Sequence, residues 1–196
     1  MIELAERFYE NGDCVMERVI NADESWIANP EVFRVNREDA HSDHAFYEEK
    51  VTEYGLDMPL RQSLNGTWKF SYADVPQKRV KDFYEENSDI SSFADIKVPG
   101  HIELAGYDTC QYINTMYPWE GHEDLRPPFV PVKHNPVGSY VTYFDIDEAL
   151  LGKKTYISFQ GVEKAFYVWI NGQFVGYSED SFTPSEWDIT PFIKEK

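Results

Sequence analysis

The chain has 196 residues, of which 35 are acidic and 18 are basic, so its formal net charge is −17. A protein that holds nucleic acid presents clustered Lys and Arg to the phosphates, so this balance excludes nucleic acid as a partner and disfavours anionic membrane surfaces. With 13 Phe, 13 Tyr and 5 Trp, the chain can build a sizeable core, and its aromatic content favours a β-rich binding or enzymatic domain.

The cysteines and the N-terminal residues indicate the cellular compartment that we expect for the protein. Cys14 and Cys110 form neither a metal-ligand spacing nor a disulfide framework, which favours a reducing compartment. The first residues lack the basic and then apolar pattern of a signal peptide, and no run of about 18 apolar residues could cross a bilayer. We therefore expect a soluble, cytoplasmic protein.

Residues 1–58 are acidic and irregular in pattern, and we expect them to form a short, partly helical or irregular N-terminal extension. Apolar residues recur at roughly helical spacing over residues 2–20, which predicts a helix divided by a turn signal at residues 11–13. His41 and His44 have the spacing of a metal-binding pair. Zinc needs further ligands and none is evident, so a surface loop is favoured there.

From residue 59 the pattern changes to that of strands. Trp68, Phe70 and Tyr72 alternate with polar residues, which predicts the first strand of a sandwich. A short helix is predicted around residues 80–86. Residues 101–138 show no periodicity and carry five prolines, and a loop of that length is either functional or an argument against the assignment.

Further strands are predicted at 140–146, 155–160, 165–170 and 173–177. Asn171-Gly172 between the last two is a strong hairpin signal, because both central residues of a type I′ turn need positive φ. Closely spaced strands without intervening helices indicate an antiparallel sandwich or jelly roll. The last residues, from 182 on, are interpreted as a strand and a short turn without a terminal strand, which would leave a sheet edge unpaired.

The sequence contains no nucleophile elbow, phosphate-binding glycine loop or zinc-binding helix motif. The remaining candidates are the loops 106–138 and 178–181, which both join strands and could meet at one end of the sandwich. Amides and carboxylates there could bind sugar hydroxyls while an aromatic face covers the apolar side of the ring. Glu179 and Asp180 are adjacent and point to opposite faces of an extended segment, so they cannot easily flank one glycosidic bond.

The residues' own chemistry leaves simpler interpretations open. A solvated acidic turn is favoured for Glu179 and Asp180, and a turn residue that bonds its own backbone is favoured for Asn114. Several other candidates are interpreted as loop or packing residues, namely His101, His122, His134, Trp119, Trp169 and Trp187.

Several segments match one known family in the correct order. They include Leu64-Asn65-Gly66-Thr67-Trp68-Lys69-Phe70, Tyr112-Ile113-Asn114-Thr115, Pro127-Pro128-Phe129-Val130-Pro131, Trp169-Ile170-Asn171-Gly172, Asp180-Ser181 and, upstream, Asn36-Arg37. From about residue 26 to the end, the chain resembles the N-terminal sugar-binding domain of bacterial β-galactosidases of glycoside hydrolase family two.

This resemblance implies an all-β, jelly-roll sandwich (galactose-binding-domain-like) over residues 59–196, cut before its last strands. In the family it precedes two immunoglobulin-like domains and a (β/α)₈ barrel that carries both catalytic glutamates of a retaining mechanism. The chain would then contain no catalytic residue and be inactive alone, as part of a homo-oligomer that hydrolyses lactose-type β-galactosides. Alone, it would be marginally stable or self-associating, because sheet edges and apolar surface stay open.

The resemblance also reverses the interpretation of two residues. The family's Asn and Asp that reach into the galactose subsite align with Asn114 and Asp180, and the backbone near Thr115 is a further candidate for substrate binding. The family's Asp also binds sodium, so Asp180 is the candidate metal ligand. The intact enzyme would use sodium and magnesium ions, with none held tightly by this chain alone. Residues 119–126 depart from the family pattern, so the entrance to the site is expected to differ in shape.

Two alternatives stay open. One is a free-standing carbohydrate-binding module without a catalytic partner. The other is a related family-two enzyme that acts on glucuronides or mannosides, although the run at residues 127–131 looks specific to the galactosidases.

Overall fold

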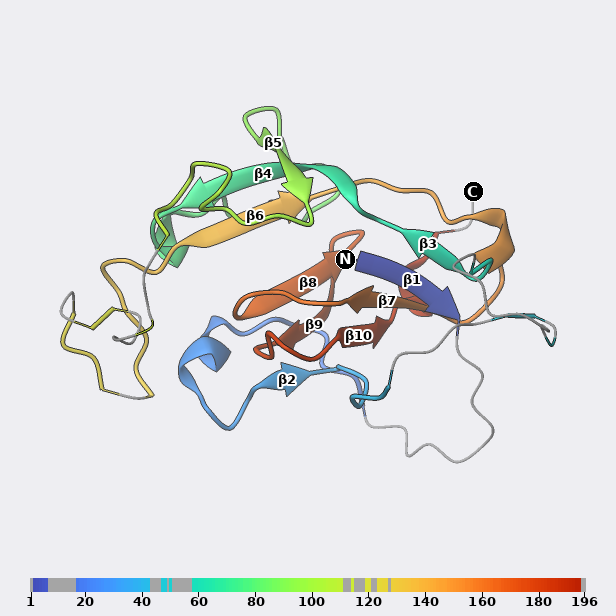
Figure 1. Cartoon of the computed structure of the whole chain (residues 1–196), viewed down its shortest axis with the longest axis horizontal. Helices are drawn as coiled ribbons and strands as arrows, with labels where there is room; N and C mark the ends of the chain where they lie inside the picture. The colour runs from blue at the N-terminus through green and yellow to red at the C-terminus, as the bar shows by residue number, and fades with distance from the viewer. Residues whose placement is uncertain are drawn as a thin grey trace. The chain divides into compact units, whose positions relative to one another are not determined.

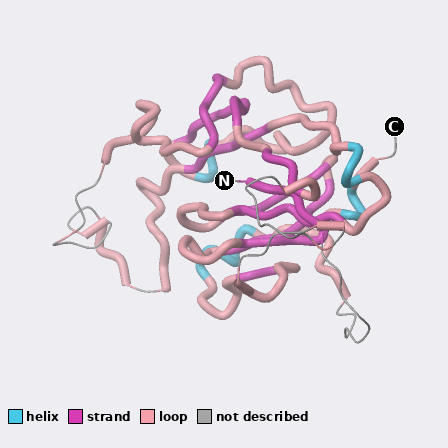
Figure 2. The backbone as a smooth tube through the Cα atoms, turned by 45° about the vertical axis from the view of Figure 1, so that its right-hand side comes forward, coloured by secondary structure: helices cyan, strands magenta, loops and turns pink. Residues whose placement is uncertain are grey.

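The computed structural model describes residues 2–6, 17–42, 47–48, 50, 58–110, 114, 119–120, 123–126 and 128–194. Within these residues the backbone forms ten strands and four short 3-10 turns, and every strand pairing is antiparallel (Figure 2). The predicted all-β class is therefore confirmed. None of the helical segments in the described part of the chain is long and apolar enough to cross a membrane.

The chain divides into two units. The first unit comprises residues 1–23, 33–65 and 144–196, and the second comprises residues 24–32 and 66–143. The first unit contains two sheets. One has the order β10-β7-β1-β3 and the other the order β2-β9-β8 (Figure 1). Their bounds are β1 Ile2–Glu6, β2 Arg34–Val35, β3 Arg61–Ser63, β7 Thr155–Phe159, β8 Phe166–Ile170, β9 Gln173–Ser178 and β10 Ser185–Asp188, with the 3-10 turns η3 Glu148–Leu150 and η4 Thr190–Phe192.

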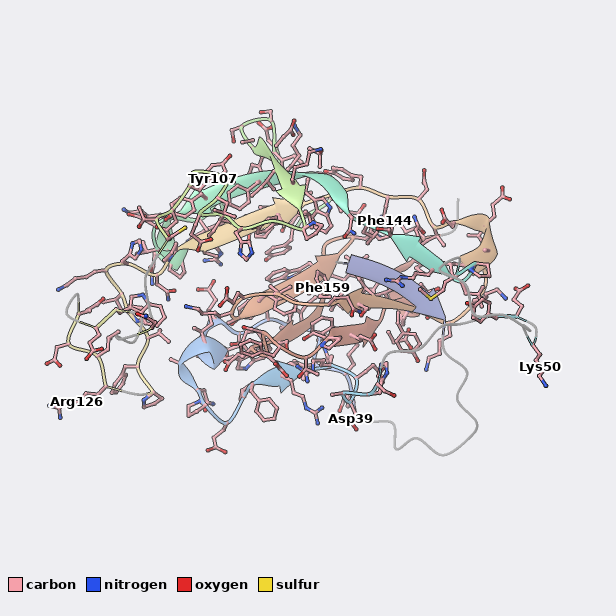
Figure 3. The ribbon with its side chains drawn as sticks, in the orientation of Figure 1. Asp39, Lys50, Tyr107, Arg126, Phe144 and Phe159 are labelled. Atoms are coloured by element: carbon pink, nitrogen blue, oxygen red, sulfur yellow. The ribbon has the colours of Figure 1, made fainter. Side chains whose placement is uncertain are left out.

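Trp187 joins the two sheets of the first unit into a sandwich. Its side chain, on β10, is fully buried, and its indole N–H donates to the carbonyl of Val35 on β2 over 3.0 Å. The indole also packs edge-on against Phe159 and Phe166, with ring centroids 5.9 and 5.6 Å away; Phe159 is labelled in Figure 3. A Cβ atom on Gly176 of β9 would lie 1.9 Å from the indole nitrogen, so only glycine fits beneath this ring. The core of the unit is built on this contact.

The second unit contains one sheet with the order β5-β4-β6, formed by β4 Gly66–Ala73, β5 Ala94–Val98 and β6 Val137–Val141, with the 3-10 turns η1 Glu24–Ala28 and η2 Pro76–Lys78. Phe70 on β4 is only 1% exposed and packs against Tyr107 and Tyr140, each with a centroid distance of 4.7 Å. The strand predicted from the alternation around Phe70 is confirmed. Tyr107, labelled in Figure 3, also stacks on Tyr72.

Three of the predicted elements differ from the structure. Ile2–Glu6 is not helical but forms β1, which pairs with β3 on one side and with β7 on the other. Its apolar and polar residues also alternate as in a strand, and pairing on both sides satisfies its backbone N–H and C=O groups. Residues 17–20 are not helical either, and residues 7–16 lie outside the described residues.

The helix predicted over residues 80–86 is wrong: the segment is a run of turns in which Asp82 has a φ of 54°, a value that ends a right-handed helix. The strand predicted at 140–146 instead spans Val137–Val141, where it pairs with β4.

The predicted β8–β9 hairpin is confirmed. Asn171 and Gly172 have φ values of 50° and 76°, and Ile170 lies opposite Gln173 in the register. Both central residues therefore occupy the left-handed region that a type I′ turn requires. The Asn171 amide also donates to the carbonyl of Phe192 over 2.8 Å, which ties the turn to η4.

Replacing Gly172 with alanine is expected to cost about 1–2 kcal/mol, because a side chain is strained in the left-handed region. For a chain of this size that corresponds to a fall in Tm of roughly 2–8 °C in a calorimetric scan. Gln173→Ala, at the exposed neighbouring position that begins β9, is the matched control and should change Tm little. Equal Tm values for both variants would contradict the turn geometry.

Candidate functional site

Asp180 lies in the first unit, in the loop that connects β9 to β10. Its Oδ1 atom accepts two backbone N–H groups, from Phe182 at 3.0 Å and from Thr183 at 3.1 Å. The backbone N–H of Phe182, then the Thr183 side chain, hold the pKa of Asp180 below its ordinary value. The side chain is 34% exposed, so this is an ionised carboxylate in a fixed orientation that an external ligand can reach.

Arg37 lies beside the Asp180 loop and is nearly buried, with 5% of its side chain exposed. Its Nη1 donates to Ser178 Oγ at 2.9 Å and to Ser185 Oγ at 3.4 Å, and its Nη2 lies 3.9 Å from Asp180 Oδ2. Ser178 ends β9 and Ser185 begins β10, and their hydroxyls lie 3.0 Å apart. The guanidinium therefore spans the base of the Asp180 loop.

Asn36 fixes the backbone next to Arg37. It has a φ of 56°, which turns the chain directly after β2. Its side-chain amide donates to the carbonyls of Val19 and Val175, and its oxygen accepts the N–H of Val19 over 3.0 Å. One asparagine thus ties the residue-19 segment to β9 beside the arginine.

Glu179, the neighbour of Asp180, has a different set of partners. Its Oε1 accepts the hydroxyl of Tyr177 over 2.5 Å, and its backbone N–H donates to the carbonyl of Phe33. Burial and then the hydrogen bond to Glu179 raise the pKa of Tyr177. The two adjacent carboxylates therefore serve separate contacts, in keeping with the alternation of an extended segment.

Two exposed aromatic rings border the Asp180 loop. Phe182 is 97% exposed two residues after Asp180, and Phe33 is 53% exposed at the residue whose carbonyl holds Glu179. Exposed aromatic faces next to a fixed carboxylate are suited to a ligand with hydroxyls on one side and C–H groups on the other. Sequence reasoning did not single out these rings, since a lone Phe in a polar loop gives no periodic signal.

Asn114 lies in the second unit and is exposed, and Thr115 lies outside the described residues. Among the other candidates, Trp187 and Trp169 are packing residues as predicted. Trp169 stacks on Tyr167 with a centroid distance of 5.7 Å. Trp119 is partly exposed with a φ of 68°.

Two of the three predicted loop histidines lie in the described part of the chain. His101 is exposed, His134 has its Nε2 3.8 Å from Asp108 Oδ1, and His122 lies outside the described residues. His41 bonds Glu186 over 2.6 Å, and His44 lies outside the described residues. The described part of the chain contains no group of three or more His, Cys, Asp or Glu side chains that could hold a metal ion. Cys110 is an exposed thiol.

The antiparallel sandwich of the first unit, with a fixed carboxylate and an exposed ring on one loop and a second exposed ring just before β2, has the features of a β-sandwich domain that binds a polyhydroxylated ligand. A comparison with protein families agrees: residues 61–196 match the family described as "Glycosyl hydrolases family 2, sugar binding domain". The chain belongs to this family.

Individual relatives are also similar over most of the chain. It is 61% identical over 172 residues to a protein named beta-galactosidase from Clostridium acetobutylicum. The aligned residues make up 87% of this chain and 19% of that relative. It is 49% identical over 189 residues to a protein named beta-galactosidase large subunit from Leuconostoc lactis, covering 90% of this chain and 30% of that protein. The chain therefore spans less than a third of the length of these relatives.

Proposed function

We propose that this chain is the sugar-binding part of a β-galactosidase that hydrolyses terminal β-D-galactosyl bonds of lactose-type substrates. Asp180 carries the proposal: a carboxylate held by two backbone N–H groups is oriented before the ligand arrives. Similarity to proteins named beta-galactosidase over 87–90% of this chain supports the choice of sugar. Asn114, in the second unit, and the backbone near Thr115 are further proposed substrate-binding positions.

The chemistry is divided between this chain and the rest of the enzyme in this proposal. Both glutamates of the retaining mechanism lie in a barrel domain outside these 196 residues, so this chain binds and orients the sugar and transfers no proton. Asp180 would accept a hydroxyl hydrogen of the galactosyl unit, a charge-assisted bond that contributes about 1.5–3 kcal/mol. Phe182 would cover an apolar face of the ring.

Asp180 is also the residue that would hold sodium. Its Oδ1 is occupied by backbone N–H groups, and its Oδ2 faces Arg37 at 3.9 Å, beyond hydrogen-bond distance. A single carboxylate oxygen whose charge is offset by an arginine suits a weakly held monovalent cation with oxygen ligands better than a divalent one. When bound, sodium would place a positive charge beside the sugar's 6-hydroxyl. For magnesium, which the intact enzyme would also use, we assign no ligand in this chain.

We further propose that residues 59–196 form the jelly-roll domain proper. Residues 1–58 would then extend it, because β1 and β2 pair with β7 and β9. The partners would be the remaining domains of the same polypeptide and other copies of it, in a cytoplasmic homo-oligomer.

A panel of chromogenic glycosides tests the substrate. In an enzyme with this chain as its N-terminal part, kcat/KM for the β-galactoside should exceed that for the β-glucuronide and the β-mannoside at least about a hundredfold, because a site that bonds specific hydroxyls rejects sugars that lack them. Preference for either of the other two would overturn the proposal.

Calorimetry of the 196-residue chain with galactose and lactose tests whether it is instead a free-standing binding module. A shared site should give no binding at sub-millimolar sugar, because half of its contacts lie elsewhere. Sub-millimolar binding would instead identify a module.

A further inference from the structure

Arg37 is a buried cation whose hydrogen-bond partners among the described residues are neutral, so its charge is not hydrogen-bonded to a carboxylate. Its closest contacts are two serine hydroxyls. Among the described residues, its nearest carboxylate is that of Asp180 at 3.9 Å, and its Nε has no hydrogen-bond partner. Burial lowers its pKa and the Asp180 charge opposes that effect, with smaller contributions from Arg34, which lowers it, and Asp39, which raises it. An arginine stays a cation under such shifts. Burying a charge on these terms costs free energy that an apolar residue of similar size would not. Stability alone is therefore a poor reason for an arginine here.

We propose that Arg37 is a positioning residue for Asp180: it binds the ends of β9 and β10 and thereby fixes the carboxylate in the orientation that receives the ligand. Nη1 reaches both Ser178 and Ser185, and Nη2 of the same planar group faces Asp180 Oδ2. Lysine has one charged nitrogen and cannot span these sites at once. This inference rests on the proposed function for the claim that Asp180 binds sugar, but the positioning itself can be measured without sugar.

Arg34, three residues earlier, provides a matched control. It is 38% exposed and pairs over 2.6 Å with Asp39, itself 89% exposed. Its charge repels that of Arg37, so its removal should not weaken the contacts that Arg37 makes at the Asp180 loop. Its substitution changes the net charge by the same unit as substitution of Arg37. Any difference between the two variants then reports geometry and not long-range charge.

The backbone amides of Phe182 and Thr183 are the direct probe, because both donate to Asp180 Oδ1. In the ¹⁵N-labelled chain, Arg37→Gln should speed hydrogen exchange at both amides by about tenfold, because the loop opens locally more often once the guanidinium contacts at its two ends are lost. Arg34→Gln should leave both rates unchanged, and the amide of Ile157 on β7 should keep its protection in both variants. Unchanged exchange at Phe182 and Thr183 in Arg37→Gln would overturn the proposal.

A second variant keeps the test valid if Arg37→Gln does not fold. Ser178→Ala leaves the guanidinium in place but removes the acceptor that its Nη1 reaches at 2.9 Å. Exchange at the two amides should then rise by roughly threefold, an intermediate effect, because the contact to Ser185 remains. The same rates as in the wild-type chain would count against the inference.

Kinetics of an enzyme that contains this chain separate positioning from a general structural role. Arg37→Lys should raise KM for a β-galactoside at least about fivefold, and it should have no further effect once Asp180 is already alanine, because the two residues act through one contact. Additive effects would show that Arg37 acts elsewhere. If Asp180→Ala itself leaves the kinetics unchanged, the proposed function fails, and the amide exchange still decides the positioning.

Discussion

Replacing Asp180 with alanine is expected to lower kcat/KM for a β-galactoside by well over tenfold in an enzyme that contains this chain. The change removes an ionised acceptor that its backbone partners hold in place, and with it a ligand of the proposed sodium ion. A charge-assisted hydrogen bond contributes about 1.5–3 kcal/mol, which corresponds to roughly 10- to 150-fold in the rate constant. The measurement is steady-state kinetics across a sodium titration.

Two further variants sharpen this result. Asp180→Asn keeps an oxygen for the N–H groups of Phe182 and Thr183 but loses the charge, so we expect activity below that of the wild-type enzyme and a weakened response to sodium. Glu179→Gln is the control, because Glu179 contacts Tyr177 and an amide oxygen can still accept that hydroxyl. If Asp180→Ala and Glu179→Gln gave the same kcat/KM, Asp180 would have no special part in binding.

Replacing Trp187 with alanine should destabilise the chain by about 3–5 kcal/mol, through a large cavity and a lost indole bond. The side chain is fully buried, contacts Phe159 and Phe166, and donates to the carbonyl of Val35. Urea unfolding followed by circular dichroism measures the loss directly. The corresponding fall in Tm is roughly 6–20 °C for a chain of this size.

Trp187→Phe separates the two contributions. Phenylalanine keeps much of the volume but leaves the Val35 carbonyl without its donor, so we expect a smaller loss of about 1–3 kcal/mol. A loss below about 1 kcal/mol for Trp187→Ala would mean that the contact between the two sheets is not the core of this unit.

The strands that could be predicted from the sequence are those whose pattern is local. Phe70 and its neighbours alternate strictly, and Asn171-Gly172 carries its own turn geometry, so β4 and the β8–β9 hairpin were both predictable. β1 was not, because its apolar residues also fit helical spacing and its pairing with β7 joins residues remote in sequence. The turns at residues 81–84 were missed because nothing in the composition signals the positive φ of Asp82.

The residues of the site also differ in whether the nearby sequence or only the folded structure reveals their role. Asp180 could be singled out only through the family resemblance, because its own chemistry favoured a solvated turn. The structure gives it features of both interpretations: it closes a local turn through Phe182 and Thr183 and stays 34% exposed. The role of Arg37 could not be predicted, because its contact with Ser178 spans 141 positions and exists only once β2 and β9 are paired.

The central place of β1 in its sheet has a kinetic consequence. Figure 1 shows β1 between β3 and β7, and Ile2 lies opposite Phe159, 157 positions later in the chain. On the ribosome, β1 therefore has no partner on its β7 side until most of this sequence has been synthesised. Contacts of such long sequence separation slow folding, into the range of milliseconds to seconds for β sandwiches. Until then the nascent chain carries an unpaired strand edge, the form in which β proteins are most prone to associate with one another.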